Sequence, residues 1–333
     1  MPNIITHVLF AQEVQNTCLL EKEKERIQKH QQLYEIGANG PDYLFFHGFN
    51  IRHFERKSHM RRLGTVAHNK GVNDFYHSAF QSILQEKDEE IKEREIVYLC
   101  GHLAHWALDS TAHPYIYYRT GTKSKIATFC HHKIESLIDA IMLKDKKGMT
   151  IKDYKVFEIC DSDVLQAQAI ARIYIPIARN IYQIEAQPYE IVEALNDWHF
   201  MQKLLYDGGG KKVRTLQKME ALTGMHGAAT GLIIPNEPYD PCDVCNLLHK
   251  QWVHPCDKTN TSTDSFFDLY DKAMPICQQA IALFLRALDT KDDRDWLDYL
   301  ANRNYTEGLD VREPMIYFDP DLESNSQRLL QEK

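Results

Sequence analysis

Apolar residues recur at three- and four-residue intervals along most of the chain, and this period is typical of α-helices that bury one face. Residues 6–33 show it first, with the charged stretch EKEKER on the exposed side, so one long helix is expected there. Glycine and proline then break the pattern, and the sequence GPD places Asp42 in a loop. Further helices are expected at residues 62–85, 89–117, 126–142, 162–184, 189–205, 264–288 and 293–301.

One of these segments has the pattern of a buried central helix. Residues 89–117 are apolar around much of the helix circumference, so neighbouring helices are expected to pack on every side. Pro114 is expected to kink or end this helix shortly after His113. Gly148 is expected to stop the next helix, because glycine favours the left-handed conformation that commonly ends helices.

Signals for β-structure are weak. No run of residues alternates convincingly between apolar and polar over several strands, and the chain has no internal repeat. Residues 221–261 are rich in Gly, Pro, Asn and Cys and are expected to be irregular. The sequence therefore predicts an all-α bundle in one domain over residues 1–310, with a loosely held tail at 311–333.

Composition narrows the class of protein further. Hydrophobic residues make up 44% of the 333 residues and charged residues 26%, as in an ordinary soluble domain. The formal net charge is −8 and the basic residues are scattered, so no stable nucleic-acid partner is expected. No apolar run is long enough to span a bilayer, and the N-terminal sequence lacks the basic and apolar regions of a signal peptide. These features predict a cytoplasmic protein whose eight scattered cysteines are reduced.

Histidine is unusually frequent, and its spacing indicates metal binding. Many of the 16 histidines lie in the first half of the chain. His105, Asp109 and His113 stand at i, i+4 and i+8, so they share one face of the expected central helix. His131 and Glu135 repeat the i, i+4 spacing on the next helix. Imidazole and carboxylate are ligands that zinc prefers, and this spacing lets two side chains bind one ion.

A structure without metal has to be weighed against this interpretation. A buried hydrogen bond between His105 and Asp109 would explain one pair. It does not explain a third group at His113, a second pair and an apolar background, because burying so many ionisable groups without cations is costly. A multinuclear metal site is therefore the preferred interpretation.

Two choices remain open among the neighbouring residues. Both His131 and His132 reach the face of Glu135; we prefer His131 at the i, i+4 position, since His132 then points about 100° away. His102 and Asp139 are left over, as candidates for orienting a ligand imidazole or carboxylate.

A separate structural zinc site is an alternative use of the cysteines. The sequence CDVCNLLHKQWVHPC gathers Cys242, Cys245, His249, His254 and Cys256. Cys-x-x-Cys with nearby His and Cys occurs in structural zinc sites, but the usual spacer between ligand pairs is missing and such short loops strain tetrahedral closure. Reduced surface or packing thiols are the preferred interpretation.

The order of these residues resembles that of the zinc-dependent phospholipase C family. Its best-known type is the bacterial phosphatidylcholine-hydrolysing enzyme, whose all-helical fold is shared with the S1/P1 nucleases. The resemblance covers the chain up to about Ala140. It rests on THVLF at His7, GPD at Asp42, His68, HWALD from His105 to Asp109, His113, and the pair His131 and Glu135.

The resemblance implies a particular set of zinc ligands. One zinc would be held by Asp42, His68 and His105, and a second by His113, His131 and Glu135. His7 and Asp109 would contribute to a third, with Asp109 bridging between ions. Asp42 would also orient or deprotonate a water, and Glu135 is the other candidate for a catalytic role.

The sequence departs from the family in three respects. The secreted phospholipases bind the third metal through an N-terminal tryptophan, whereas this sequence begins Met1-Pro2, six residues before His7. The interval from Asp109 to His113 is shorter than in those enzymes, and no position matches their choline-contacting residues. The third site is therefore expected to be weak, absent or built differently.

Two or three zinc ions so placed predict hydrolysis of a phosphoric ester, carried by a small molecule or a lipid. The alternatives are a nuclease or nucleotidase on the same scaffold, and a non-catalytic protein that the metal stabilises. A lipid substrate would bring transient contact with a membrane surface. Aromatic residues offer walls for a substrate pocket, although packing in the core is preferred for each of Tyr43, Phe45, Phe46, Phe75 and Tyr76.

Overall fold

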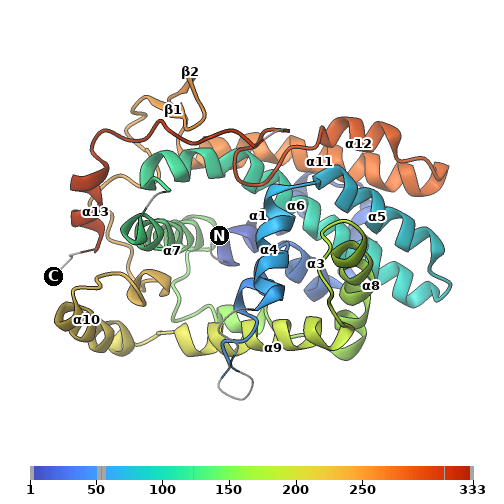
Figure 1. Ribbon diagram of the computed structural model, residues 1–333, viewed down its shortest axis with the longest axis horizontal. Coiled ribbons are helices and arrows are strands. Elements are labelled where there is room, and N and C mark those ends of the chain that lie inside the picture. The colour runs from blue at the N-terminus through green and yellow to red at the C-terminus, as the bar shows by residue number, and fades with distance from the viewer. Residues whose placement is uncertain (1–3, 51–53, 55–57, 123, 311, 331–333) are drawn as a thin grey trace.

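A 32-residue helix, α6 (Glu89–Thr120), runs through the middle of the molecule and carries three of the expected metal ligands (Figure 1). The computed structural model describes residues 4–50, 54, 58–122, 124–310 and 312–330. The Asp88 side chain caps the start of α6 by accepting hydrogen bonds from the backbone N–H groups of Glu90 and Ile91. Helices pack around α6 on several sides, and the helix is buried along most of its length.

The remaining elements are also mainly helical. Among the described residues the other α-helices are α1 (Ile4–Thr17), α2 (Glu21–Gln28), α3 (Gln31–Gly37), α4 (His59–Asn69), α5 (Val72–Gln85), α7 (Lys125–Lys147), α8 (Val164–Asn180), α9 (Pro188–Leu205), α10 (Lys211–Thr223), α11 (Phe266–Thr290), α12 (Arg294–Leu300) and α13 (Leu322–Leu330). Short 3-10 helices are η1 (Asp42–Phe46), η3 (Val156–Glu158) and η4 (Thr230–Leu232). Strands β1 (Trp252–His254) and β2 (Asp257–Ser262) form an antiparallel hairpin that pairs Trp252 with Ser262. The all-α class is confirmed.

Two glycines allow α3 to lie unusually close to α6. A Cβ atom on Gly101 would stand 2.1 Å from the carbonyl oxygen of Tyr34, and one on Gly37 would stand 2.3 Å from that of Tyr98. Any side chain at either position would push the helices apart. This close packing fixes the end of α3, after which the chain turns into the loop that carries Asp42.

Several expected helix boundaries were wrong. The single helix expected at residues 6–33 is three helices, α1 to α3, with an extended residue, Leu20, before α2. The helix expected at 62–85 is also divided, because Gly71 adopts a φ of +61° between α4 and α5. Pro114 neither ends nor interrupts α6, which continues to Thr120. The stop at Gly148 is confirmed by its left-handed conformation.

The second half of the chain contains more order than expected. Helix α10 was not predicted. Its last residues, η4, β1 and nearly all of β2 lie within the segment expected to be irregular at 221–261. The segment at 311–333 contains α13, which packs on α7 and buries Leu329 to 2% exposure. The domain boundaries themselves stay a prediction.

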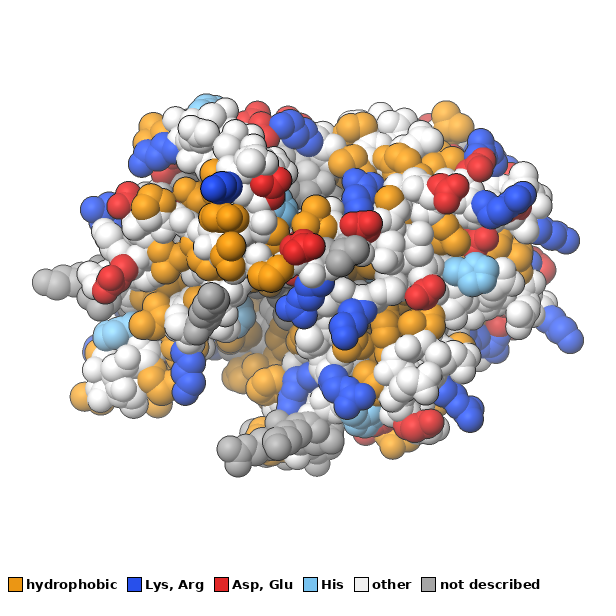
Figure 2. Space-filling view, turned by 45° about the horizontal axis from the view of Figure 1, so that its top comes forward, with side chains coloured by type: hydrophobic (Ala, Val, Ile, Leu, Met, Phe, Trp, Pro, Cys, Tyr) orange, Lys and Arg blue, Asp and Glu red, His pale blue; other side chains and the backbone are white. Residues whose placement is uncertain are grey.

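The surface and the thiols agree with the composition. Figure 2 shows acidic and basic side chains interspersed over one face of the molecule. All eight cysteines fall within the described residues and are free thiols. Among the helices that the structure describes, none combines the length and hydrophobicity that a bilayer-spanning segment requires.

A buried carboxyl group on α6 predicts a pH-dependent stability. Glu95 is 0% exposed, and within the described residues neither of its carboxylate oxygens has a hydrogen-bond partner. Burial raises the pKa of Glu95 from its ordinary value near 4.5 to about 7. The folded state therefore binds more protons than the unfolded state between these values, and this group makes stability fall as pH rises through them.

We expect Glu95→Gln to stabilise the protein at about pH 8 by up to ~3 kcal/mol and to change little at about pH 4. Denaturant unfolding of both proteins at a series of pH values measures the difference. Exposed Glu89, near the start of the same helix, gives the control Glu89→Gln, for which the difference should stay flat. Equal stability of Glu95→Gln and the natural protein at high pH would contradict the prediction.

Candidate metal centre

The eight expected ligands come from five elements and meet inside the bundle. None is more than 7% exposed. They are His7 on α1, Asp42 at the start of η1, His68 on α4, His105, Asp109 and His113 on α6, and His131 and Glu135 on α7. Residues spread over the first 135 positions of the chain therefore form one buried cluster.

Asp109 lies at the centre of the cluster. One of its carboxylate oxygens is 3.2 Å from Nε2 of His7. The other is 3.1 Å from Nε2 of His105 and 3.3 Å from Nδ1 of His113. The two oxygens thus face histidines from two helices, which is the arrangement that a bridging carboxylate needs.

The remaining ligands extend the cluster on both sides of Asp109. Nε2 of His68 is 3.0 Å from a carboxylate oxygen of Asp42. On the other side, a Glu135 oxygen is 2.7 Å from Nε2 of His131 and 3.6 Å from Nε2 of His113. A small cavity of about 10 Å³ lies next to Asp109, His113 and Glu135.

Three groups of ligand atoms are close enough to hold an ion, since the atoms of each group lie within 4.8 Å of one another. The group of His113, His131 and Glu135 is the one that the resemblance implies for the second zinc. The other two groups combine the ligands differently from the sets that the resemblance implies. They combine His7 with Asp42 and His105, and His68 with His105 and Asp109. His105 belongs to both groups, because its ring lies between those of His7 and His68 at centroid distances of 4.3 and 5.7 Å.

Backbone carbonyl groups orient two of the imidazoles. His68 donates through Nδ1 to the carbonyl of Gly64 at 2.7 Å, and His113 donates through Nδ1 to that of Tyr305 at 2.9 Å. These hydrogen bonds fix the tautomer and leave Nε2 of each ring for a metal. Sequence reasoning missed both partners, since any residue type supplies a carbonyl.

A glycine brings the Asp42 loop against His105. Gly40 has a φ of +51°, and a Cβ atom there would lie 2.2 Å from the His105 ring. Only glycine combines this backbone conformation with so close an approach. The sequence GPD therefore has a structural role as well as supplying Asp42.

The histidines keep the carboxyl groups of the cluster ionised. Burial alone would raise the pKa of Asp109, but His105, His113 and His7 outweigh it and hold the pKa well below its usual value. The same balance, with His131 as the main neighbour, lowers the pKa of Glu135. The carboxylates therefore carry the charge that metal binding requires.

The cluster fits divalent cations better than a metal-free core. Among the described residues, Nδ1 of His7 and Nδ1 of His105 are buried without a hydrogen-bond partner. Nε2 of both rings and the Asp42 carboxylate lie 3.0 to 3.2 Å from an ionisable partner but form no hydrogen bond of regular geometry within the same part of the chain. Leaving that many polar atoms unsatisfied would cost several kcal/mol. Nitrogen and carboxylate oxygen are the donor atoms of zinc sites, so zinc ions would satisfy these groups.

Comparison with known proteins agrees with this geometry. The model of the zinc-dependent phospholipase C family matches residues 6–179, just over half of the chain. The chain belongs to this family. No curated protein and no solved structure matches the chain. The match contains every ligand of the cluster, and the two findings together support a zinc-dependent hydrolase.

Other candidate residues of this phospholipase C family member have different roles. His132 is half-buried and belongs to none of the three ligand groups, so the geometry favours His131. His102 lies 3.0 Å from the hydroxyl groups of both Tyr76 and Tyr174, and its two ring nitrogens hold these tyrosines rather than a ligand. Met1 and Pro2, on which the expectation for the third site rests, lie outside the described residues.

The cysteine-rich segment forms no ligand group among the described residues. Nε2 of His254 donates to the carbonyl of Glu307 at 2.9 Å, and the Cys256 thiol contacts the carbonyl of Glu313. These contacts tie the hairpin to the segment that follows α12. Reduced packing thiols stay the preferred interpretation of this segment.

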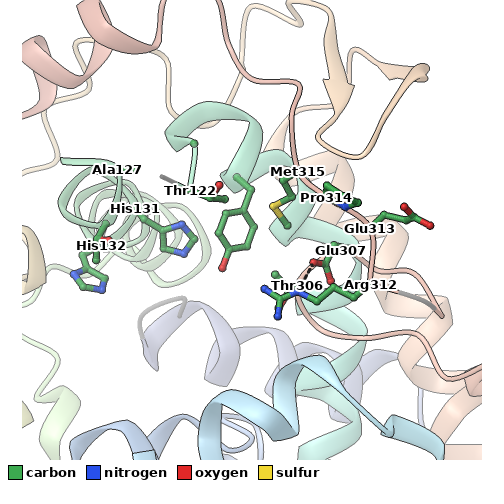
Figure 3. A pocket seen from close by; sticks show the side chains of 13 residues that line it. Thr122, Ala127, His131, His132, Thr306, Glu307, Arg312, Glu313, Pro314 and Met315 are labelled. Carbon is green, nitrogen blue, oxygen red and sulfur yellow. Dashed lines mark ion pairs between the residues drawn. The ribbon is translucent and has the colours of Figure 1, made fainter. Parts of the chain in front are cut away.

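Of the aromatic residues considered as pocket walls, Tyr43, Phe75 and Tyr76 are core residues with at most 2% exposure. A different set lines the pocket beside the metal centre, which has a volume of about 440 Å³. Figure 3 shows His131 and His132 on one side of this pocket, and Glu307 and Arg312 on the other.

Asp139 positions the helix that carries His7. Its carboxylate accepts hydrogen bonds from the backbone N–H groups of Ile5 and Thr6 and from the Thr6 hydroxyl, at 2.6 to 2.9 Å. These donors belong to the first turn of α1, where N–H groups lack partners inside the helix. Asp139 thus joins α7 to α1 next to the ligand His7, acting on the backbone rather than on an imidazole.

We expect Asp139→Ala to lower the free energy of unfolding by about 2–3 kcal/mol, because it leaves buried N–H donors unpaired. Metal should also be retained about 10-fold more weakly, since His7 loses its fixed position. Thermal unfolding and metal analysis after dialysis measure the two effects. Asp145→Asn, at an exposed site on the same helix, is the matched control. Unchanged stability of Asp139→Ala would contradict this role.

Proposed function

We propose that this protein hydrolyses the phosphodiester bond of a phospholipid and releases the phosphorylated head group. The observation that carries the proposal is one buried cluster of three ligand groups that includes His131, which also lines a pocket open to the surface. Membership of the phospholipase C family supports a lipid as the substrate. We also propose a cytoplasmic location, on the composition of the sequence alone.

Two to three zinc ions in this cluster would polarise the phosphoryl oxygens, make a water more acidic and stabilise the leaving alkoxide. The carboxylates of the cluster supply the negative charge that would hold the ions in place. Asp42 is an ionised, buried carboxylate; burial would raise its pKa, but His105 and His68 lower it. It therefore stays ionised, which suits it to orienting a water or, as a weak base, to accepting the proton of that water. Glu135 lies beside Nε2 of both His113 and His131, so these three residues would hold one ion together.

The pocket beside the cluster would receive the head group. Arg312 stands on the wall opposite His131 (Figure 3), with its Nε 3.4 Å from a carboxylate oxygen of Glu307. Its side chain is 61% exposed, so the guanidinium is accessible from solvent. A guanidinium in this place suits a phosphate oxygen, with which it forms charge-assisted hydrogen bonds.

The proposal is tested by assaying zinc-loaded protein on phosphatidylcholine, on other phospholipids and on chromogenic phosphodiesters. We expect release of phosphorylated head group and diacylglycerol. Release of nucleotides from single-stranded DNA or RNA, with lipids untouched, would instead identify a nuclease. Retention of zinc without turnover of any phosphodiester would overturn the enzymatic proposal and leave a metal-stabilised protein.

We expect Arg312→Gln to lower kcat/KM for a phospholipid by about 10-fold or more, because a charged hydrogen bond to the substrate contributes about 1.5–3 kcal/mol. Arg312→Lys should recover part of the loss by keeping the charge. Zinc content should be the same in all three proteins, since Arg312 belongs to none of the ligand groups. Unaltered kcat/KM in Arg312→Gln would remove Arg312 from the substrate site.

A further inference from the structure

Helix α10 stands out because it buries almost nothing. Of its 13 residues only Glu220 is buried, and Met219 and Leu222 are 58% and 88% exposed. It begins and ends at glycines in the left-handed conformation, Gly210 and Gly224. A helix of this length is marginal in water on its own and normally depends on a packed apolar face. Because α10 exposes apolar residues and packs no extensive apolar face on the described part of the protein, burial within this chain does not explain why these residues are apolar.

A polar contact fixes α10 to the body of the protein. The Glu220 carboxylate accepts hydrogen bonds from the backbone N–H groups of Gly227, Ala229 and Thr230 and from the Thr230 hydroxyl, at 2.7 to 3.0 Å. The turn that donates these bonds is itself held on α7, where Ser136 donates to the carbonyl of Gly231 at 2.7 Å. The helix is therefore anchored through its inward side, and its other side is left to solvent.

The outward side of α10 combines apolar and basic residues. By helix geometry, Lys211, Lys218 and Leu222 lie within roughly 20° of the direction opposite Glu220. Met219 lies about 100° from Glu220 and about 60° from Leu222, so it borders this outward side. Arg214 adds a further cation, whereas the Lys212 ammonium donates to the carbonyls of Leu204 and Tyr206. Glu220, turned inward, is the only acidic residue in the helix. This cationic surface is a local exception in a chain of net charge −8.

We propose that α10 is a docking element that lies flat on an anionic phospholipid surface, with Met219 and Leu222 entering the interface. This inference rests on the proposed function, which brings the protein to lipids. Amphipathic helices with basic residues beside an apolar centre bind in this way. Charge complementarity favours the lipid surface, because each basic residue near an anionic surface contributes about 1 kcal/mol.

The position of α10 relative to the pocket fits this role. The turn after α10 packs on the part of α7 that lines the pocket, with Gly231 against the backbone of Phe129 and beside His132. Docking through α10 would therefore act on the wall that also carries the ligand His131. We infer that the helix increases the time the pocket spends at the lipid surface rather than taking part in the reaction.

The test uses fluorescence of Leu222→Trp mixed with vesicles of phosphatidylcholine, with and without phosphatidylglycerol. The four natural tryptophans are at most 7% exposed, so the added indole dominates the change. We expect a blue shift with the anionic vesicles that weakens as salt is added. Leu20→Trp, at a 71% exposed site before α2, is the matched control and should show no shift. No shift in Leu222→Trp would overturn the proposal.

A second variant separates docking from catalysis. Met219→Asp with Leu222→Asp should weaken vesicle binding by about 10-fold or more, since two apolar side chains no longer leave water. Hydrolysis of a soluble chromogenic phosphodiester should be unchanged. Vesicle binding without any hydrolysis would defeat the proposed function and leave the docking role standing. The docking role would be defeated if the double variant bound vesicles as well as the natural protein does. It would also be defeated if the helix bound an acidic partner protein and not the vesicles.

Discussion

Replacing Asp109 by asparagine should remove more metal than any other single substitution in the cluster. Asp109 is the only residue of the three ligand groups that lies within 3.3 Å of histidines His7, His105 and His113 at once. Its removal would take a negative charge from more than one ion, and the amide that replaces it is a poorer ligand. Loss of a residue that only hydrogen-bonds to a metal ligand typically weakens metal binding by about 10- to 100-fold. For the ligand Asp109 itself we expect metal binding to weaken by at least about 100-fold.

Metal analysis after dialysis against a competing chelator measures this loss, with hydrolysis of a soluble phosphodiester as a second readout. His131→Gln gives the comparison, because His131 belongs to the group with His113 and Glu135 and should cost a single ion. Asp109 also belongs to one group, but its oxygens face histidines of all three groups. Asp145→Asn, exposed on α7, should keep full metal content. A zinc content of Asp109→Asn equal to that of the natural protein would show that this carboxylate does not bridge ions.

The sequence predicts the ligands well because their spacing is local. Residues at i and i+4 on a helix share a face whatever the rest of the fold does, so His105 and Asp109, or His131 and Glu135, can be paired without a structure. Single ligands such as His7 and His68 carry no such signal. Only the order of residues along the family pattern suggests them, and the structure then shows that they meet Asp109 and Asp42.

The parts that sequence reasoning missed depend on distant contacts. The Tyr305 carbonyl orients His113 across 192 positions of sequence, and no residue pattern marks a carbonyl acceptor. The division of the first expected helix has a similar cause. Apolar spacing continues through residues 6–33, but packing against α6 and α7 turns the chain twice within it. Periodicity reports which side chains are buried and not where a helix stops.

Removing the metal should weaken the whole fold, because the cluster joins α1, η1, α4, α6 and α7. Without cations, three carboxylates remain buried among histidines: Asp42, Asp109 and Glu135. The oxygens of Asp42 then have no hydrogen bond of regular geometry from the described residues. A ligand present at 1,000 times its dissociation constant stabilises the folded state by about 4 kcal/mol. We therefore expect chelation to lower the Tm by roughly 6 °C for each ion removed and zinc to restore it.

Thermal unfolding with and without chelator tests this, and the variants show where the stability comes from. Asp109→Asn should respond much less to chelator than the natural protein, since it has less metal to lose. Asp145→Asn should respond fully. An equal Tm in the two conditions, for protein that carried zinc beforehand, would mean that the helices hold the ligands together without the ions. The metals would then serve the reaction alone, and the buried carboxylates would have to be stabilised by their histidines.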